Sequence, residues 1–99
     1  MKIWVDDVRR PPKGYLWVQS VFEAITCLVE CDTRGWDVEI VDLDHDAGEY
    51  SQYGGDYIKI LEWMEHMKRN YPIRIHSANP VGIENMRRII NKNGWIEVF

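Results

Sequence analysis

Short apolar runs alternate with amphipathic segments along the chain, and this alternation predicts an α/β fold. Residues 38–43 form a strand-length run with several β-branched residues, and acidic and imidazole side chains follow at 44–46. Such a run is typical of a buried parallel strand. Residues 2–7 and 73–77 show the same pattern. Because ligands bind at the carboxyl edge of open parallel sheets, we expect the polar ends of these three strands to share a rim.

Three segments between the strands have the apolar spacing of a helix. Capping residues indicate where each helix begins and ends: Ser20 and Gly35 for the first, Asp56 and the pair Tyr71 and Pro72 for the second, and Asn79 and Gly94 for the third. Glu23 completes a capping box with Ser20, and Pro80 is suited to the first helical position. A last strand is expected over residues 95–99.

The connection between the first two strands is too short for a crossover helix, which needs about a dozen residues or more. Residues 9–14 include two prolines and a glycine, so we expect an extended loop that leads to a strand at 15–18. Six or seven extended residues at about 3.3 Å each can still cross back over a short strand. We therefore expect a parallel second strand, with an antiparallel edge strand as the alternative. The Gly- and Tyr-rich loop at 47–55 is a candidate lid.

Composition limits the classes of protein and partner. A chain of 99 residues, 45% hydrophobic, is expected to form one domain, 1–99, with one modest core. Acidic residues outnumber basic ones by 16 to 12, which argues against an extended grip on nucleic acid. A phosphate-bearing nucleotide or an RNA end is a compatible partner, and a homodimer is left open.

Cys27 and Cys31 share a helical face and are expected to be reduced core thiols. Without a signal peptide, a long apolar span or a lipidation motif, we expect a cytoplasmic protein with no membrane contact.

Acidic residues at two strand ends are the strongest chemical signal. Asp6 and Asp7 follow the first strand, and Asp44 follows the central one. Carboxylates that converge repel one another, and a hard divalent cation with oxygen ligands relieves the repulsion. These three residues therefore indicate a site for Mg²⁺ or Mn²⁺. The alternative is that Asp6 and Asp7 only end the strand and cap a turn.

Histidines stand beside these acids. His45 and Asp46 directly follow Asp44, and His76 lies at the end of the fourth strand. Imidazole takes up and gives off a proton near neutral pH, which suits acid–base work on a phosphodiester. We take His45, His76 and Asp46 as candidate catalytic residues. The alternatives are a hydrogen-bonded structural role for His45 and a solvated face, away from the cleft, for His76.

Four further residues are candidates for binding the substrate. Arg9 and Arg10, on the loop beside the acidic pair, can clamp a phosphate, or they are a solvated turn. Ser77 and Asn79 stand near His76, and capping alone would explain Asn79. Asp42 is expected to pack or pair beside its strand and is left out of the site.

Several of these segments together resemble a response-regulator receiver domain: residues 5–7, Asp44, Ser77 and residues 18–24. Within that superfamily, the motifs at 43–46, 54–57, 75–80 and 93–95 more closely resemble the receiver-like family named for cyclic-phosphate processing, over nearly the whole chain. The resemblance implies a small flavodoxin-like, three-layer α/β sandwich. Its sheet would be mostly parallel, with five strands in the order 2-1-3-4-5, and the first and last receiver helices would be missing.

The resemblance to ordinary receivers implies a Mg²⁺ site at Asp6, Asp7 and Asp44. It also implies that Asp44 is the phosphoacceptor and that Ser77 contacts the phosphoryl group. Ordinary receivers also carry a lysine at the end of the fifth strand. The corresponding residues here, 97–99, are Glu, Val and Phe. This departure counts against a phosphotransfer switch.

Three functions are compatible with the sequence. The favoured one is a metal-dependent phosphoesterase acting on a cyclic phosphate, either the 2',3'-cyclic phosphate end of an RNA or a cyclic nucleotide signal, which the resemblance places in RNA repair or defence. The second is a binding module that sequesters a phosphorylated nucleotide, with aromatic residues of the lid stacking on the base. The third is a degenerate receiver that is phosphorylated at Asp44. Two histidines beside three acids favour the first.

Overall fold

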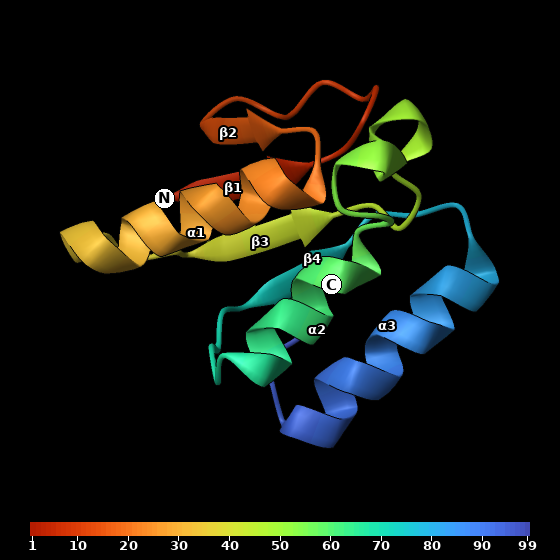
Figure 1. The fold of residues 1–99 in the computed structure, drawn as a ribbon. Helices are drawn as coiled ribbons and strands as arrows, with labels where there is room; N and C mark the ends of the chain where they lie inside the picture. The colour runs from red at the N-terminus through yellow and green to blue at the C-terminus, as the bar shows by residue number, and fades with distance from the viewer.

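The computed structural model describes residues 1–99 as an α/β domain built from eight elements (Figure 1). In chain order they are β1 (Lys2–Val5), β2 (Tyr15–Val18), α1 (Val21–Arg34), β3 (Ile40–Leu43), the 3-10 helix η1 (Gly48–Tyr53), α2 (Ile58–His66), β4 (Ile73–Ile75) and α3 (Pro80–Asn93). No helix is both long and apolar enough to cross a membrane.

The sheet has the strand order β2-β1-β3-β4, and every pair of neighbours is parallel. The expected parallel orientation of β2 is therefore confirmed, and the short Pro-containing loop does cross back from β1. All strands point the same way in Figure 1, and η1 and the segments after β1, β3 and β4 gather beyond their carboxyl ends. This arrangement brings the polar strand ends to one rim.

The expected fifth strand is not formed, so the sheet has four strands and not five. The carboxyl-terminal segment makes a single parallel bridge, between Glu97 and Ile73. Two backbone hydrogen bonds hold it, from Ile73 N to Ile96 O at 3.0 Å and from Val98 N to Ile73 O at 2.7 Å. Of the residues of β4, only Ile73 takes part in this bridge, so no ladder forms on this edge.

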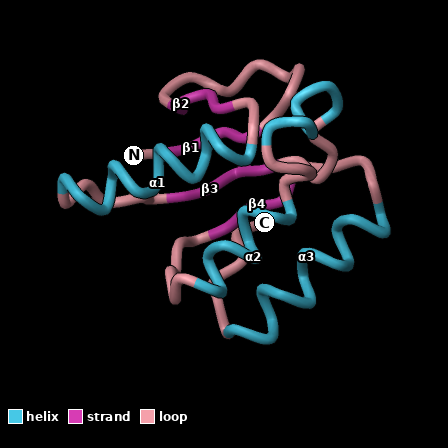
Figure 2. The backbone as a smooth tube through the Cα atoms, viewed as in Figure 1, coloured by secondary structure: helices cyan, strands magenta, loops and turns pink.

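The helices cover only one face of the sheet, so the fold has two layers and the expected three-layer sandwich is wrong (Figure 2). Alternate strand residues, such as Val5 and Leu43, point toward the helices and join Met86 and Ile90 in one core of 16 buried residues. Trp4 and Asp42, which are paired in register, point to the other face and lie outside that core. This second face therefore has no helical cover.

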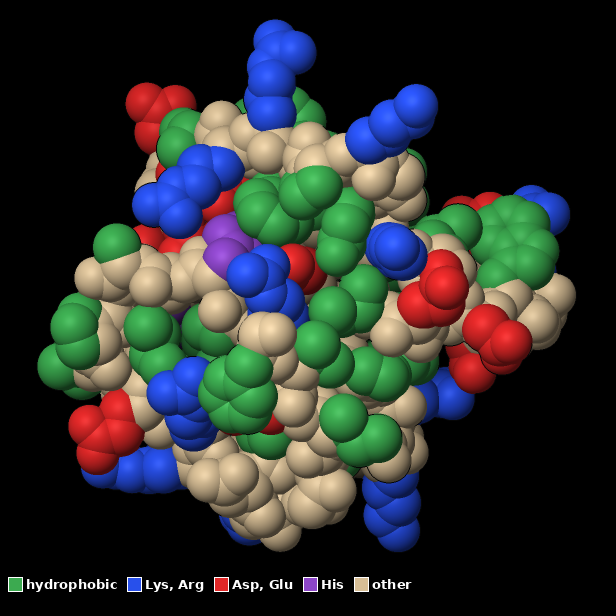
Figure 3. All heavy atoms as spheres, turned by 180° about the vertical axis from the view of Figure 1, so that it is seen from behind, with side chains coloured by type: hydrophobic (Ala, Val, Ile, Leu, Met, Phe, Trp, Pro, Cys, Tyr) green, Lys and Arg blue, Asp and Glu red, His purple; other side chains and the backbone are tan.

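The loop between β1 and β2 lies against part of the uncovered face. Trp4 is 7% exposed, and its indole N–H donates to Arg9 O at 2.9 Å. The indole of Trp17 donates to Asp6 O at 2.8 Å. Figure 3 views the molecule from behind and shows a histidine between acidic and basic side chains on this side. Indole hydrogen bonds therefore tie the loop down next to the acidic strand end.

The caps expected for two helices are confirmed. Ser20 Oγ accepts from Glu23 N at 3.0 Å at the start of α1, and Asn79 Oδ1 accepts from Gly82 N at 3.0 Å at the start of α3. Gly35 and Gly94 end these helices in the left-handed conformation that favours glycine.

The expected bounds of the second helix are wrong at both ends. The helix α2 begins at Ile58, two residues after Asp56, whose Oδ1 instead accepts from Ala47 N at 3.0 Å. The helix ends at His66, before the Tyr71 and Pro72 pair that was expected to stop it. The backbone turns already at Lys68, which has a φ of 56°. Asp56 thus anchors the segment before η1 rather than capping α2.

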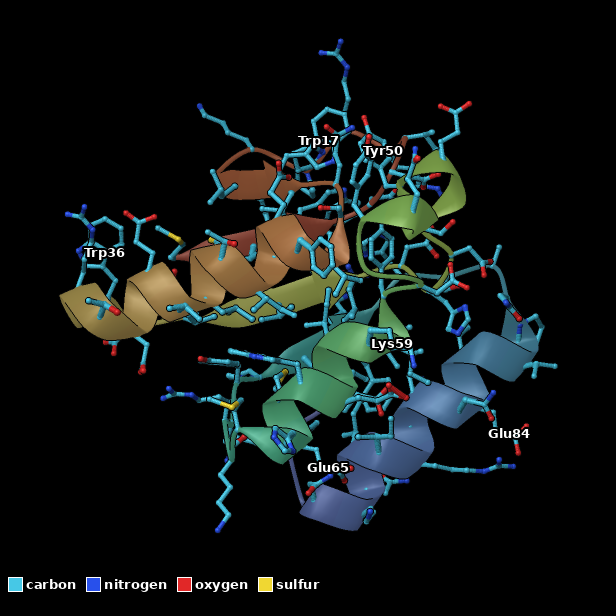
Figure 4. The ribbon with its side chains drawn as sticks, in the orientation of Figure 1. Trp17, Trp36, Tyr50, Lys59, Glu65 and Glu84 are labelled. Carbon is cyan, nitrogen blue, oxygen red and sulfur yellow. The ribbon has the colours of Figure 1, made fainter.

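The Gly- and Tyr-rich segment after β3 is partly ordered as η1. Its Tyr50 packs against the hydrophobic core, which gives the segment a fixed contact. In Figure 4, Tyr50 lies beside η1, on the side of the molecule where Trp17 is also labelled and away from Trp36 at the end of α1. The segment is therefore held beside the carboxyl rim of the sheet, where a lid would be needed.

Both thiols lie on α1, and both are free, as expected. Cys31 is buried and Cys27 half-buried. Burial, together with the neighbouring Cys31, raises the pKa of Cys27 to about 11. The raised pKa keeps Cys27 a thiol rather than a reactive thiolate, and the buried Cys31 is a packing residue.

Candidate functional site

Three carboxylates converge at the carboxyl ends of β1 and β3. Val5 and Leu43 are paired in register, and Asp44 N donates to Val5 O at 3.0 Å. Asp6, Asp7 and Asp44 follow these strand ends, and each offers a carboxylate oxygen within 4.8 Å of those of the other two. The structure therefore brings together the three acids that the sequence assigned to a metal site.

Asp6 is fully buried and has three hydrogen-bond partners. Its Oδ1 accepts from Val8 N at 3.0 Å and Arg9 N at 2.9 Å, and its Oδ2 lies 2.9 Å from His76 Nε2. Burial alone would raise the pKa of Asp6, but these hydrogen bonds outweigh it and lower the pKa. Asp6 therefore caps the turn after β1 as an ionised carboxylate while also facing the other acids.

The pKa of Asp7 shifts in the opposite direction to that of Asp6. Burial raises its pKa, and the neighbouring carboxylates of Asp6 and Asp44 raise it further. A Cβ on Gly48, at the start of η1, would collide with Asp7 Oδ2, so η1 lies directly on this carboxylate. Three oxygen donors with unrelieved repulsion are a donor set that fits a hard divalent cation such as Mg²⁺ or Mn²⁺.

A second group of polar residues stands beside the acids. His45 N donates to Asp44 Oδ1 at 2.7 Å, and His45 Nδ1 lies 2.9 Å from Asp46 Oδ1. Asn79 Nδ2 lies 3.3 and 3.4 Å from the two Asp46 carboxylate oxygens. Asn79 is therefore both the cap of α3 and a neighbour of His45 and Asp46. Capping the helix does not prevent it from lying in the candidate site.

The ring of His45 packs against Gly82 in the first turn of α3. A Cβ at position 82 would lie 2.5–2.8 Å from the ring atoms of His45, closer than carbon atoms approach. Only the absence of a side chain at Gly82 leaves room for the ring. The side chain of His45 is 14% exposed, so the ring is confined but still reaches solvent.

His76 lies between two buried carboxylates, neither in open solvent nor free in the cleft. Its Nε2 lies 2.9 Å from Asp6 Oδ2, and its Nδ1 lies 2.6 Å from Asp42 Oδ1. The ring stacks on Trp4 with centroids 3.8 Å apart and planes within 6°. Its side chain is 9% exposed. Both ring nitrogens are thus occupied by protein groups in this arrangement.

Three further candidates, which are positively charged or polar, follow β1 and β4 in the chain. Arg9 and Arg10 are exposed, and neither belongs to an ion pair of the protein. Ser77 Oγ accepts from Asn79 N at 3.1 Å, which shapes the turn into α3. The arginines are therefore free to pair with an anion, whereas Ser77 already has a local structural partner.

Sequence reasoning missed a polar network on the helix side of the acids. The hydroxyl of the buried Tyr57 donates to Gln19 O at 2.8 Å, and Gln19 Nε2 donates to Asp7 O at 3.1 Å. Burial raises the pKa of Tyr57, and the nearby acids, first Asp7 and then Asp6, add to this. The sequence offers no signal for this network, because Tyr57 reads as an ordinary core residue.

Asp42 pairs beside its strand as expected, but its connection to the site was missed. It accepts from Arg74 Nη1 at 3.0 Å through Oδ2 and contacts His76 through Oδ1. A signal was present: Asp42 is a lone charge within a buried strand, and Arg74 is its register partner in β4. A buried charge needs such partners.

A shallow groove between β2 and α1 is lined by apolar residues that include Leu16, Phe22 and Cys27. None of the acids or histidines described above lines it. The candidate site is therefore defined by its converging polar groups at the sheet rim rather than by a deep cavity.

The parallel sheet, with Asp6, Asp7 and Asp44 at its carboxyl rim, defines a receiver-like α/β domain. Residues 1–92 match the family model described as the cyclic-phosphate processing receiver domain, and the chain belongs to this family. No curated protein and no solved structure matches the chain. The family resemblance seen in the sequence is thereby confirmed, and the family name concerns phosphate chemistry.

Proposed function

We propose that this protein is a metal-dependent phosphoesterase that opens a cyclic phosphate. The observation that carries the proposal is the convergence of three carboxylate oxygens within 4.8 Å; the residue that follows Asp44, His45, donates its backbone N–H to Asp44 Oδ1. The family name, which refers to cyclic-phosphate processing, supports the same substrate class. Either the 2',3'-cyclic phosphate end of an RNA or a cyclic nucleotide has the required group.

Asp6, Asp7 and Asp44 are the proposed ligands of Mg²⁺ or Mn²⁺. Such a cation, when bound, stabilises negative charge on phosphoryl oxygens. Arg9 and Arg10 are proposed to pair with the substrate phosphate, because their guanidinium groups have no carboxylate partner in the protein. Ser77 and Asn79 complete the proposed contacts at the rim.

His45 is the proposed proton-transfer group. An Nδ1–H that donates to Asp46 would leave Nε2 as the basic nitrogen. Nε2 would take a proton from the attacking water as the water oxygen bonds to phosphorus. The bond from phosphorus to one ester oxygen breaks as that oxygen receives a proton from solvent and becomes a hydroxyl, and Nε2 then releases to solvent the proton that it took from the attacking water. The cyclic diester plus water thus gives a phosphate monoester.

Gly82→Ala tests the placement of His45. The added methyl group would push the imidazole away from its position beside Asp46. We expect kcat on a cyclic phosphate to fall about 10- to 100-fold, because misplacing a catalytic group is costly. Steady-state kinetics would measure the change, with Val81→Ala, at the exposed neighbouring position, as the control. Wild-type kcat in Gly82→Ala would contradict the role of His45.

Asp7→Asn tests the acidic cluster without substrate. Removing this charge relieves its repulsion with Asp6 and Asp44, so in EDTA we expect the variant to be more stable by about 1 kcal/mol, which is roughly 4–8 °C in Tm. We expect millimolar Mn²⁺ to raise the Tm of the wild type but not that of the variant. Thermal unfolding with and without Mn²⁺ measures both effects. An unchanged Mn²⁺ response in Asp7→Asn would remove Asp7 from the site.

The pKa shifts of Asp6 and Asp7 predict how the free energy of unfolding in EDTA depends on pH. Because folding raises the pKa of Asp7, protonated Asp7 favours the folded state, and its contribution is lost as the pH rises through the folded pKa. Folding lowers the pKa of Asp6, so its contribution is lost as the pH falls through the folded pKa. Asp7→Asn should remove the first effect and leave the second.

The proposed function is tested by incubating the protein, with and without Mn²⁺, with 2',3'-cyclic nucleotides, cyclic-phosphate RNA ends and cyclic dinucleotides, followed by chromatography. We expect turnover that is lost in Asp44→Ala and His45→Ala. Recovery of every compound intact, with one retained on the protein, would replace catalysis by sequestration. Stable labelling of Asp44 by a small phosphodonor, without turnover, would instead indicate a degenerate receiver.

A further inference from the structure

We infer that His76 is a positioning residue: together with Asp42 and Trp4, it fixes the Asp6 oxygen that is directed to a cation. The inference deepens the proposed function and rests on its metal site. It assigns His76 a role other than proton transfer. The three supporting residues come from three strands, with Trp4 on β1, Asp42 on β3 and His76 just after β4.

The hydrogen bonds of Asp6 determine which of its oxygens is available. An ionised carboxylate has about four acceptor positions, two on each oxygen. Oδ1 uses both of its positions for Val8 N and Arg9 N. Oδ2 has His76 Nε2 as its single partner and keeps one position. Oδ2 is therefore the Asp6 oxygen that would be available to a cation, and it is the atom that His76 contacts.

The other nitrogen of His76 is held just as firmly. Its Nδ1 contacts Asp42 Oδ1 at 2.6 Å, and Asp42 is fully buried. Arg74 donates to the second oxygen of Asp42 at 3.0 Å, so this carboxylate cannot rotate without losing a partner. With both ring nitrogens in contact with carboxylates, His76 has none left for a substrate.

Trp4 fixes the plane of the imidazole. The two rings stack with centroids 3.8 Å apart and planes within 6°. The indole N–H donates to Arg9 O, and Arg9 N donates to Asp6 Oδ1. The same unit therefore also positions the loop that carries the proposed phosphate-binding arginines. This unit lies on the sheet face that has no helix, because Trp4 and Asp42 are paired in register and point away from the core.

The test is the affinity of the substrate-free protein for Mn²⁺, measured from the electron paramagnetic resonance signal of free Mn²⁺. His76→Gln offers a single amide nitrogen in place of two ring nitrogens, and we expect Mn²⁺ to bind about 10- to 100-fold more weakly, as for other partners of metal ligands. The matched control is His66→Gln, on the exposed surface of α2, which should bind like the wild type. Ile90→Val, in the core, controls for lowered stability alone.

The outcomes separate this inference from the proposed function. Wild-type Mn²⁺ affinity in folded His76→Gln would overturn the positioning role and leave the metal site standing. Absence of Mn²⁺ binding by the wild type would overturn both. If His76→Gln does not fold, Asp42→Asn decides, because it keeps the Oδ1 acceptor but removes the charge that holds His76. We expect severalfold weaker Mn²⁺ binding in Asp42→Asn, and wild-type affinity there would overturn the inference.

Discussion

Asp42→Ala is expected to lower the free energy of unfolding by about 3–5 kcal/mol. The carboxylate is fully buried and is the shared partner of Arg74 and His76. Its removal leaves the 9% exposed imidazole of His76 with one carboxylate instead of two and opens a cavity beside Trp4. Small domains are stable by only about 5–15 kcal/mol, so this loss is a large share of the total. Urea unfolding at low temperature is the appropriate measurement.

Glu84→Ala is the control for this prediction. Glu84 also accepts from an arginine, Arg88, at 2.8 Å, but both side chains are largely exposed, and Figure 4 shows Glu84 pointing away from the sheet. We expect a change within about 0.5 kcal/mol, as for other surface ion pairs. A loss below about 1 kcal/mol in Asp42→Ala would show that the pairing on the uncovered face contributes little to stability.

His45→Ala is expected to lower kcat on a cyclic phosphate by about 10²- to 10⁴-fold, the usual contribution of a positioned proton-transfer group. The imidazole of His45 contacts Asp46 through Nδ1 and packs against Gly82, so the ring is oriented before substrate binds. We expect KM to change much less than kcat, because the proposed phosphate contacts come from Arg9 and Arg10. Initial rates over a range of substrate concentrations would separate the two parameters.

His66→Ala is the matched control, since His66 is exposed at the end of α2, away from the acidic strand ends. It should leave kcat unchanged. Equal kcat values for His45→Ala and the wild type would exclude His45 from the reaction and return it to the structural role that the sequence left open. Unfolding in urea should show that both variants keep the fold.

The helix ends of α1 and α3 could be predicted because their signals are local. Ser20, Asn79, Gly35 and Gly94 each act on a backbone group within a few residues. Asp56 has the same type of side chain but bonds to Ala47, nine residues away. A capping residue therefore predicts a helix start only where no more distant amide competes for its carboxylate.

The sheet was predicted less completely because strand pairing depends on distant partners. The parallel orientation of β2 was favoured because the loop is long enough to cross back, but an antiparallel edge strand was left open, and only the structure decides between them. The fifth strand did not form, because the segment around Glu97 meets only Ile73 at the free edge of the short β4. The number of layers was wrong for a related reason: missing helices were expected, but the resulting bare sheet face was not.

The acidic part of the site followed directly from topology. Asp6, Asp7 and Asp44 come after parallel strands, and parallel strands place their carboxyl ends side by side. The surroundings of His76 could not be predicted in this way. We expected His76 in the cleft, and its alternation with Arg74 offered a solvated face as the alternative. Only the structure shows that Trp4 and Asp42 enclose the ring.

The most direct test of the central claim is mass spectrometry of a 2',3'-cyclic nucleotide after incubation with the protein and Mn²⁺ in ¹⁸O-labelled water. Attack of water on phosphorus predicts a nucleoside monophosphate that carries one ¹⁸O on its phosphate, formed by the wild type and not by Asp44→Ala. Recovery of the cyclic compound unlabelled and intact, along with the other cyclic phosphates tested, would contradict the assignment of this site to cyclic-phosphate hydrolysis.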